Sequence, residues 1–281
     1  MTELRRLMIQ AMTVRGMAAR TQQTYVTAVR RLARHYRRPP DELSVDEVQS
    51  YLAHMLEAEG LSWSTCSIAA NAFRFLYHVT LKRSAVDFVV PRPRQAQRLP
   101  EILSREEVVR LIDAVANPKQ RLIVETIYGC GLRVSEATGL KIRDIDRDRM
   151  TVRIEQGKGR KDRYVPLSKR LRNRFEEYWA TNPPRQWVFE GHIPDRRLHI
   201  SAVQKAYTIA KLRAGIHKHG GVHALRHAYA THLIESGVDV LTVQRLLGHR
   251  SVSTTMRYFH LSQARMAVVR SPLDLLDTAR S

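Results

Sequence analysis

The sequence is poor in cysteine and contains no long apolar run. Its 281 residues include only two cysteines, Cys66 and Cys130, which lie far apart in the chain. A disulfide framework is therefore not expected, and both are interpreted as buried free thiols. No stretch of about 18 apolar residues is available to span a bilayer, and the first residues lack the apolar core of a signal peptide. These absences favour a cytoplasmic protein with no membrane partner.

Acidic residues are also scarce relative to basic ones. Lys and Arg total 47 against 27 Asp and Glu, which gives a net charge of +20 and a sequence pI near 10.6. Residues 1–40 alone hold nine arginines and one acidic residue. Such an excess repels itself unless a polyanion is the working partner, so the composition predicts binding to nucleic acid.

Residues 1–87 are predicted to form a small all-helical domain. Apolar residues recur at spacings of three and four over residues 21–36, and Ser44 with Glu47 forms a capping-box signature before a second helix that Gly60 closes. A third helix is expected over about 64–81, with Ile68 among its inward residues. Residues 88–100 follow, rich in proline and arginine without an acidic residue, and are interpreted as a linker.

Residues 101–281 are predicted to form a second domain that begins with a capping box at Ser104 and Glu107. The β-branched segments 150–155 and 163–167 flank a glycine-rich basic turn, a pattern typical of a β-hairpin. Helices are expected at about 169–180, 201–214, 224–236, 239–247 and 251–258, followed by a C-terminal tail. The predicted fold class is mainly α with a small antiparallel β-sheet.

Four local patterns in the second domain could carry chemistry, although each has an ordinary structural interpretation. Arg133 with Glu136 usually forms a surface ion pair, and a lysine between glycines is usually a solvated turn. Two histidines four residues apart, His223 and His227, could bind zinc, but no Glu follows the first and no third ligand is evident. No metal or other cofactor is therefore expected. His227 is interpreted as structural, and the tyrosine at 258 could be a packed side chain.

Taken together, the patterns resemble the tyrosine recombinase (phage integrase) family. The contexts GLRVSEA, GKGRKDR, HALRH, LLGH and T-x-x-Y are similar to those of the family and occur in the same order. The resemblance covers most of the chain, with a SAM-like helical core-binding domain at 1–87 and a catalytic domain from 101. It implies six catalytic positions: Arg133, Lys158, His223, Arg226, His249 and Tyr258.

The resemblance implies a site-specific recombinase or integrase that cleaves and rejoins DNA through a 3′-phosphotyrosyl intermediate, with Tyr258 as nucleophile and without metal or ATP. Arg133 and Arg226 would clamp the phosphate, since each guanidinium can donate two hydrogen bonds to it. His223 and His249 would donate further hydrogen bonds to the phosphate, and one of them, with His223 preferred, would accept the tyrosine proton. Lys158 would protonate the leaving 5′ oxygen. Glu136 resembles the acidic residue that holds the first arginine, and it could equally be a helix N-terminal acid.

The implied partners are double-stranded DNA and further copies of the chain, as a tetramer on two DNA sites. The tail after residue 260 would pack on a neighbouring protomer or on its own domain. Three alternatives remain: a type IB topoisomerase, a DNA-binding protein without catalysis, and a zinc nuclease that uses His223 and His227. The expected phosphate contacts outside the catalytic domain are Arg30, Arg31, Arg34, Arg37 and Arg38 in the helical domain and Arg92 and Arg94 in the linker.

Overall fold

The computed structural model describes residues 2–83, 88–90, 101–155, 162–193, 195–249 and 251–261, without the side chains of 257 and 259–261. The chain divides into two compact units, Met1–Gln97 and Arg98–Ser281. Among the described residues, no helix is long and apolar enough to cross a membrane. Three parts of the chain that the sequence analysis singled out lie outside the described residues: linker residues 91–100 with Arg92 and Arg94, the position of Lys158, and the tail from residue 262.

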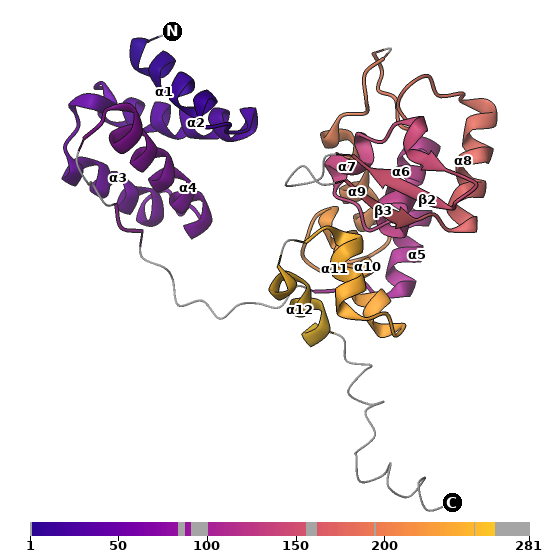
Figure 1. The fold of residues 1–281 in the computed structure, drawn as a ribbon. Coiled ribbons are helices and arrows are strands. Elements are labelled where there is room, and N and C mark those ends of the chain that lie inside the picture. The colour runs from indigo at the N-terminus through magenta and orange to yellow at the C-terminus, as the bar shows by residue number, and fades with distance from the viewer. Residues whose placement is uncertain are drawn as a thin grey trace, which may run out of the picture. The chain divides into compact units, whose positions relative to one another are not determined.

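The N-terminal unit is all-helical, as predicted (Figure 1). Its first helix was not anticipated from the sequence; it packs on the second helix and buries Met8 and Met12. The last α-helix continues directly into a π-helical segment. The elements are α1 Glu3–Val14, α2 Ala19–Tyr36, a 3₁₀ turn Pro40–Glu42, α3 Val45–Glu57, α4 Trp63–Arg74 and the π-helix Phe75–Thr80.

Two details of this unit differ from the sequence-based expectations. Ile68 is exposed, because α4 turns the stripe of Cys66, Ala69 and Phe73 inward instead. Phe88, placed in the linker by composition, is fully buried in the core of the unit. Val89 next to it exchanges two hydrogen bonds with the side-chain amide of Gln49, so residues 88–90 pack on the N-terminal unit.

The C-terminal unit combines helices with one small sheet, which confirms the predicted fold class (Figure 1). The sheet is antiparallel in the order β1-β2-β3, and Val152 lies opposite Val165 in the predicted hairpin. The elements are α5 Arg105–Asp113, α6 Pro118–Gly129, α7 Val134–Thr138, a 3₁₀ turn Ile142–Asp144, β1 Ile145–Asp146, β2 Thr151–Ile154, β3 Arg163–Pro166, α8 Lys169–Thr181, α9 Ile200–Arg213, α10 His223–Glu235, α11 Val240–Leu247 and α12 Val252–Leu261.

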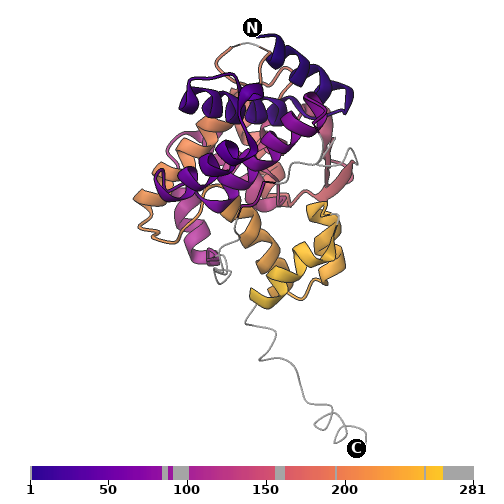
Figure 2. The same ribbon diagram turned by 90° about the vertical axis from the view of Figure 1, so that its left-hand side faces the viewer.

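Helix α10 is the central element of the C-terminal unit. It is buried along most of its length and packs against α6, α11 and α12. Both ribbon views show α10, α11 and α12, orange to yellow, grouped together within the unit (Figures 1 and 2). A small apolar cluster of Tyr229, Val243, Leu247 and Tyr258 joins these three helices. Side chains from α10 and α12 are therefore held in contact by their own packing.

Candidate active site

The first part of the site forms where α7 begins. Arg133 is the N-cap residue, and Glu136 at the third helical position accepts its backbone N–H at 2.8 Å. The Arg133 guanidinium also donates to Glu136 at 2.7 Å. The turn before it requires glycine at 131, because φ is +61° there and a Cβ would run into the ring of Tyr229. Glu136 is thus both a helix N-terminal acid and the partner of Arg133.

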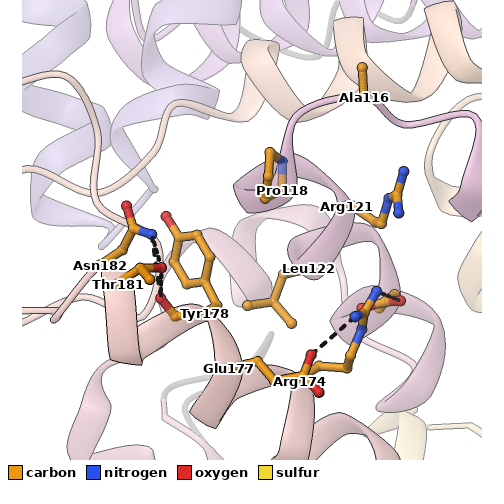
Figure 3. Close-up of a pocket in the computed structure, with 10 residues that line it drawn as sticks. Ala116, Pro118, Arg121, Leu122, Arg174, Glu177, Tyr178, Thr181 and Asn182 are labelled. Carbon is orange, nitrogen blue, oxygen red and sulfur yellow. Dashed lines mark hydrogen bonds and ion pairs between the residues drawn. The ribbon is translucent and has the colours of Figure 1, made fainter.

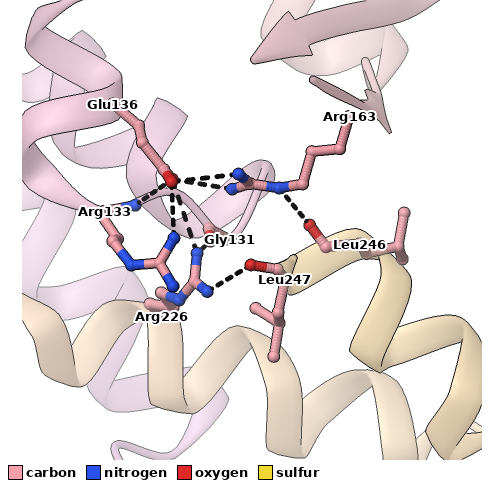
Figure 4. A network of polar contacts seen from close by, with 7 residues as sticks. All are labelled: Gly131, Arg133, Glu136, Arg163, Arg226, Leu246 and Leu247. Atoms are coloured by element: carbon pink, nitrogen blue, oxygen red, sulfur yellow. Dashed lines mark hydrogen bonds and ion pairs between the residues drawn. The ribbon is translucent and has the colours of Figure 1, made fainter. Parts of the chain in front are cut away.

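Glu136 lies at the centre of a guanidinium cluster that consists of Arg133, Arg163 and Arg226 (Figure 4). Arg163 binds both carboxylate oxygens, at 3.0 and 2.7 Å, and Arg226 approaches to 3.6 Å. Burial alone would raise the pKa of Glu136, but the hydrogen bonds and charge of Arg163, with those of its other neighbours, lower it to about 2. The carboxylate is therefore ionised at neutral pH, and it holds three cations together.

Arg226 is fully buried on α10. It donates to the carbonyl of Gly131 at 2.7 Å and to that of Leu247 at 2.5 Å, which ties the turn before α7 to the end of α11 (Figure 4). Its Nε is buried without a hydrogen-bond partner among the described residues. Burial and the charge of Arg133 lower the pKa of Arg226 to about 10, so the side chain remains cationic at neutral pH. One strong donor in the cluster is left unused.

Arg163 completes the cluster from strand β3. Besides binding Glu136, it donates to the carbonyl of Leu246 at 2.8 Å near the end of α11 (Figure 4). That helix closes at Gly248, where φ is +64° and a Cβ would lie only 3.0 Å from the Arg163 side chain. Glycine therefore allows the end of α11, and the histidine that follows it, to approach the cluster closely.

Two predicted histidines border the cluster. His223 is the first residue of α10 and is exposed on one side, while partial burial of its ring, Arg226 and Arg133 lower its pKa. His249 follows α11 and shares a 3.0 Å hydrogen bond with the hydroxyl of Thr255. Burial and the charges of Arg226 and Arg133 lower the pKa of His249 to about 4. His249 is therefore a neutral hydrogen-bonding group at pH 7.

Tyr258 lies on α12 and is buried against this border. Its phenol oxygen is 2.8 Å from Nδ1 of His227, and its ring stacks with that of His249 at 6.3 Å between centroids. The phenol is also close enough to Arg226 to act on that group's pKa. A potential nucleophile, two neutral imidazoles and a cationic cluster are thus in one place, as phosphoryl chemistry requires.

The structure brings together five of the six predicted catalytic residues and Glu136; Lys158 lies outside the described residues. Sequence reasoning missed Arg163, which no local pattern marks because its partner lies 27 residues away. It gave His227 a structural role and did not anticipate that its Nδ1 lies 2.8 Å from the phenol oxygen of Tyr258. The four-residue spacing from His223 was the available signal, since it puts both rings on one helix face.

Three further observations concern metal binding, a pocket and the two cysteines. Across the described residues, no group of three or more His, Cys, Asp or Glu is arranged to hold a metal ion. A pocket of about 390 Å³ between α6 and α8 contains none of the predicted residues (Figure 3). Its cations are already engaged: Arg121 donates to two backbone carbonyls, and Arg174 pairs with Glu125 and Glu177. Both cysteines are free and buried, as predicted.

The predicted DNA contacts of the N-terminal unit lie on and just after α2. All five side chains are exposed. Arg31 pairs with Glu59 at 2.6 Å, and Arg38 pairs with Glu47 at 2.8 Å. The side chains of Arg30 and Arg34, one helical turn apart, form no ion pair with any described residue. The set is Arg30, Arg31, Arg34, Arg37 and Arg38.

Comparison with known proteins gives consistent matches over most of the chain. The model of the phage integrase family matches residues 101–265, and that of the phage integrase N-terminal SAM-like domain matches residues 4–87. A Sinorhizobium fredii protein, y4qK, which is named as a putative integrase/recombinase, is 40% identical over 277 residues, covering 98% of this chain and 90% of its own.

Two further comparisons agree. The tyrosine recombinase XerD of Bifidobacterium longum is 37% identical over 247 residues, covering 79% of each chain. The crystal structure of a lambda integrase tetramer bound to a Holliday junction has the same fold, with a TM-score of 0.74 and 17% identity over 89% of this chain and 74% of that chain.

Proposed function

This chain belongs to the phage integrase family of tyrosine recombinases, and from that membership we propose that it cuts and rejoins DNA at specific sites through a 3′-phosphotyrosyl bond to Tyr258. The observation that carries the mechanism is the contact of the Tyr258 phenol with an imidazole beside the guanidinium cluster. The tyrosine–phosphate bond conserves the energy of the cleaved phosphodiester, so the reaction needs neither metal nor ATP.

In this mechanism the cationic groups bind the scissile phosphate. Arg133, whose side chain is 26% exposed, and the exposed His223 are the first groups that a phosphate meets. Arg226 lies beneath them, and its Nε, which no described residue binds, is the donor left for a phosphate oxygen. Because Arg226 and Tyr258 are both buried, binding of the scissile phosphate in this mechanism is accompanied by a local rearrangement that exposes them.

The remaining predicted residues have narrower roles. His249, neutral and hydrogen-bonded to Thr255, donates its second nitrogen's proton to a non-bridging phosphate oxygen. Lys158 protonates the leaving 5′ oxygen, a role carried over from the family. Glu136 fixes the arginines and does not touch DNA.

The DNA partner and the assembly follow from the charge and the relatives. A net charge of +20 suits a phosphate backbone, and the exposed arginines of α2 with Arg92 and Arg94 are proposed to contact it. The lambda integrase was crystallised as a tetramer on a Holliday junction. We infer a tetramer on two DNA sites for this chain too, acting on cytoplasmic DNA.

The proposal is tested by looking for a covalent protein–DNA adduct in the presence of EDTA. Nicked suicide substrates drawn from the native flanking DNA are incubated with wild-type protein and with Tyr258→Phe, which removes only the hydroxyl of a buried ring. Denaturing gels should show an adduct for wild type alone. Strand exchange between two labelled sites, rather than relaxation of supercoils, then separates a recombinase from a topoisomerase. A bound substrate that yields no adduct would leave only a DNA-binding role.

A further inference from the structure

One histidine of the site has no role in the mechanism above, although it forms a direct hydrogen bond with the nucleophile. Nδ1 of His227 lies 2.8 Å from the phenol oxygen of Tyr258, and the two ring centroids are 5.5 Å apart. With the imidazole proton on Nε2, Nδ1 accepts a hydrogen bond from the phenol. This is the distance at which a proton can pass directly between two groups.

The other two histidines are differently engaged. Nδ1 of His249 bonds the hydroxyl of Thr255, and its ring stacks on the Tyr258 ring. His223 is exposed, and its ring meets that of His227 edge-on at 4.5 Å. Both are suited to contact phosphate, so among the three histidines His227 has the geometry of a proton acceptor for Tyr258.

The position of His227 on α10 places its contact with Tyr258 beside the residues proposed to bind phosphate. His223, Arg226 and His227 occupy positions i, i+3 and i+4 and therefore share one face of the helix. A phosphate held by the first two lies next to the third. Because the phenol of Tyr258 already contacts His227, its movement toward that phosphate begins from this hydrogen bond.

We propose that His227 is a catalytic residue that takes the phenolic proton of Tyr258 during strand cleavage and returns it during rejoining; this role rests on the proposed function. In cleavage the phenolic O–H bond breaks and an Nδ1–H bond forms, while the phenolic oxygen bonds to phosphorus. The bond from phosphorus to the 5′ oxygen breaks, and that oxygen takes a proton from the donor assigned above to Lys158. Rejoining runs the same transfers in reverse.

Electrostatics make this acceptor dependent on substrate. Burial, His223 and Arg226 lower the pKa of His227 to about 4, which keeps it neutral at pH 7. The titratable and charged groups next to it are His223 and Arg226 on α10 and Tyr258 on α12. His249 after α11 stacks on Tyr258, and Arg133 at the start of α7 acts on the pKa of His223 and of His249. A bound phosphodiester adds the negative charge that this surrounding lacks, which raises the pKa of His227 and strengthens it as a base.

The same helix supplies a matched control. Nδ1 of His232 also lies 2.8 Å from a tyrosine hydroxyl, that of Tyr128 on α6, away from the guanidinium cluster. His227→Asn and His232→Asn therefore each remove one His–Tyr pair from α10. Asn keeps a hydrogen-bonding atom near the Nδ1 position but accepts no proton at neutral pH.

The experiment measures single-turnover adduct formation on the nicked substrate between pH 6 and 9, with DNA affinity measured in parallel. We expect His227→Asn to cleave about 10²- to 10⁴-fold more slowly at pH 7 with unchanged affinity, the range that a general base contributes. Its rate should rise with pH toward the phenol pKa, whereas the wild-type rate stays flat. Added imidazole should restore His227→Ala, and His232→Asn should cleave like wild type.

Three results would overturn the assignment. Cleavage by His227→Asn at the wild-type rate would remove any need for the imidazole. If His227→Asn were slow but had the pH profile of wild type, or if imidazole failed to restore His227→Ala, His227 would be a residue that only positions Tyr258. Absence of an adduct with wild-type protein on bound DNA would overturn the proposed function, and the role of His227 with it.

Discussion

Arginine side chains in the two units of the chain differ in their burial and in the groups they bind. In the C-terminal unit, Arg226 is fully buried and the Arg163 side chain is 9% exposed, and both are fixed by a carboxylate and by backbone carbonyls. In the N-terminal unit, the arginines of α2 are exposed. Arg31 on this helix and Arg38 just after it pair with the partly exposed Glu59 and Glu47, and Arg38 also donates to the carbonyl of Glu42. Buried arginines cost desolvation and gain fixed geometry, whereas exposed ones act through charge alone.

The same contrast appears at the N-termini of α3 and α7. Each helix has a glutamate at its third position that accepts the N-cap N–H at 2.8 Å, Glu47 in α3 and Glu136 in α7. The Glu47 side chain is 32% exposed and pairs with Arg38, while the Glu136 side chain is 7% exposed and faces three guanidinium groups. The same glutamate-to-N-cap hydrogen bond is therefore combined with a surface pair in one unit and with a buried guanidinium cluster in the other.

The largest difference between the two units is expected in the loss of stability caused by Glu136→Gln compared with that caused by Glu47→Gln. Glutamine preserves the capping geometry in both helices. In α7 it leaves Arg163 and Arg226 buried without a counter-charge, which should destabilise the C-terminal unit by about 3–5 kcal/mol. In α3 the same change should have little effect on stability, because Glu47 pairs with Arg38 at the solvent-exposed surface.

Amide hydrogen exchange measured by mass spectrometry on the full chain reports the two units separately. Peptides from α7 and α10 should lose protection in Glu136→Gln, and peptides from α3 should change little in Glu47→Gln. Equal losses in the two variants would show that burial does not distinguish the two glutamates.

A second, smaller effect is the pH dependence of the stability difference between wild type and Glu136→Gln. The folded-state pKa of Glu136 is about 2, below its ordinary value of 4.5, so the ionised form stabilises the folded state. That contribution is complete above about pH 5 and is lost as the pH falls toward 2. The gap in unfolding free energy between wild type and Glu136→Gln should therefore be constant from pH 7 to 5 and then shrink.

Hydrogen exchange over a urea series at pH 7, 5, 4 and 3, corrected for the intrinsic exchange rate at each pH, measures that gap. The pKa of Glu47 is also lowered, first by its hydrogen bond to the Ser44 N–H, but its exposure makes the matching gap small. A gap that instead widens as the pH falls would mean that the Glu136 carboxylate does not stabilise the fold.

What the sequence could predict was local. The capping boxes at Ser44 and Ser104 mark the starts of α3 and α5 because the cap and its glutamate lie within one turn. The six proposed catalytic positions could be predicted because each lies in a short pattern similar to the family's own. Helix α1 was missed although Leu4, Met8 and Met12 recur at helical spacing, because no capping box marks its start.

What the sequence could not predict depends on contacts between distant segments. Arg163 is an arginine in a strand, and only folding places it on Glu136, 27 residues earlier. His227 was recognisable as a neighbour of His223, but its partner Tyr258 is 31 residues away and belongs to a different helix. The burial of Arg226 likewise follows from the packing of α10 against α6, α11 and α12, so the residues next to Arg226 in the sequence do not predict it.

The smallest expected effect concerns the exposed arginines on and just after α2. Arg31 and Arg38 share their charge with Glu59 and Glu47, whereas Arg30 and Arg34 have no ion-pair partner among the described residues. The double variant Arg30→Gln with Arg34→Gln should therefore weaken duplex binding more than Arg31→Gln with Arg38→Gln. Because these side chains are expected to bind the phosphate backbone, a duplex of arbitrary sequence is a sufficient probe.

The measurement is the slope of log affinity against log salt concentration, by fluorescence anisotropy with a labelled duplex. Removing one arginine–phosphate interaction should reduce the slope by about 0.9, so the Arg30 and Arg34 double variant should show close to twice that reduction. The adduct yield on saturated substrate should stay unchanged, since neither residue belongs to the C-terminal unit. If both double variants reduced the slope equally, surface pairing would not decide which arginines reach DNA, and charge density along α2 would be the controlling quantity.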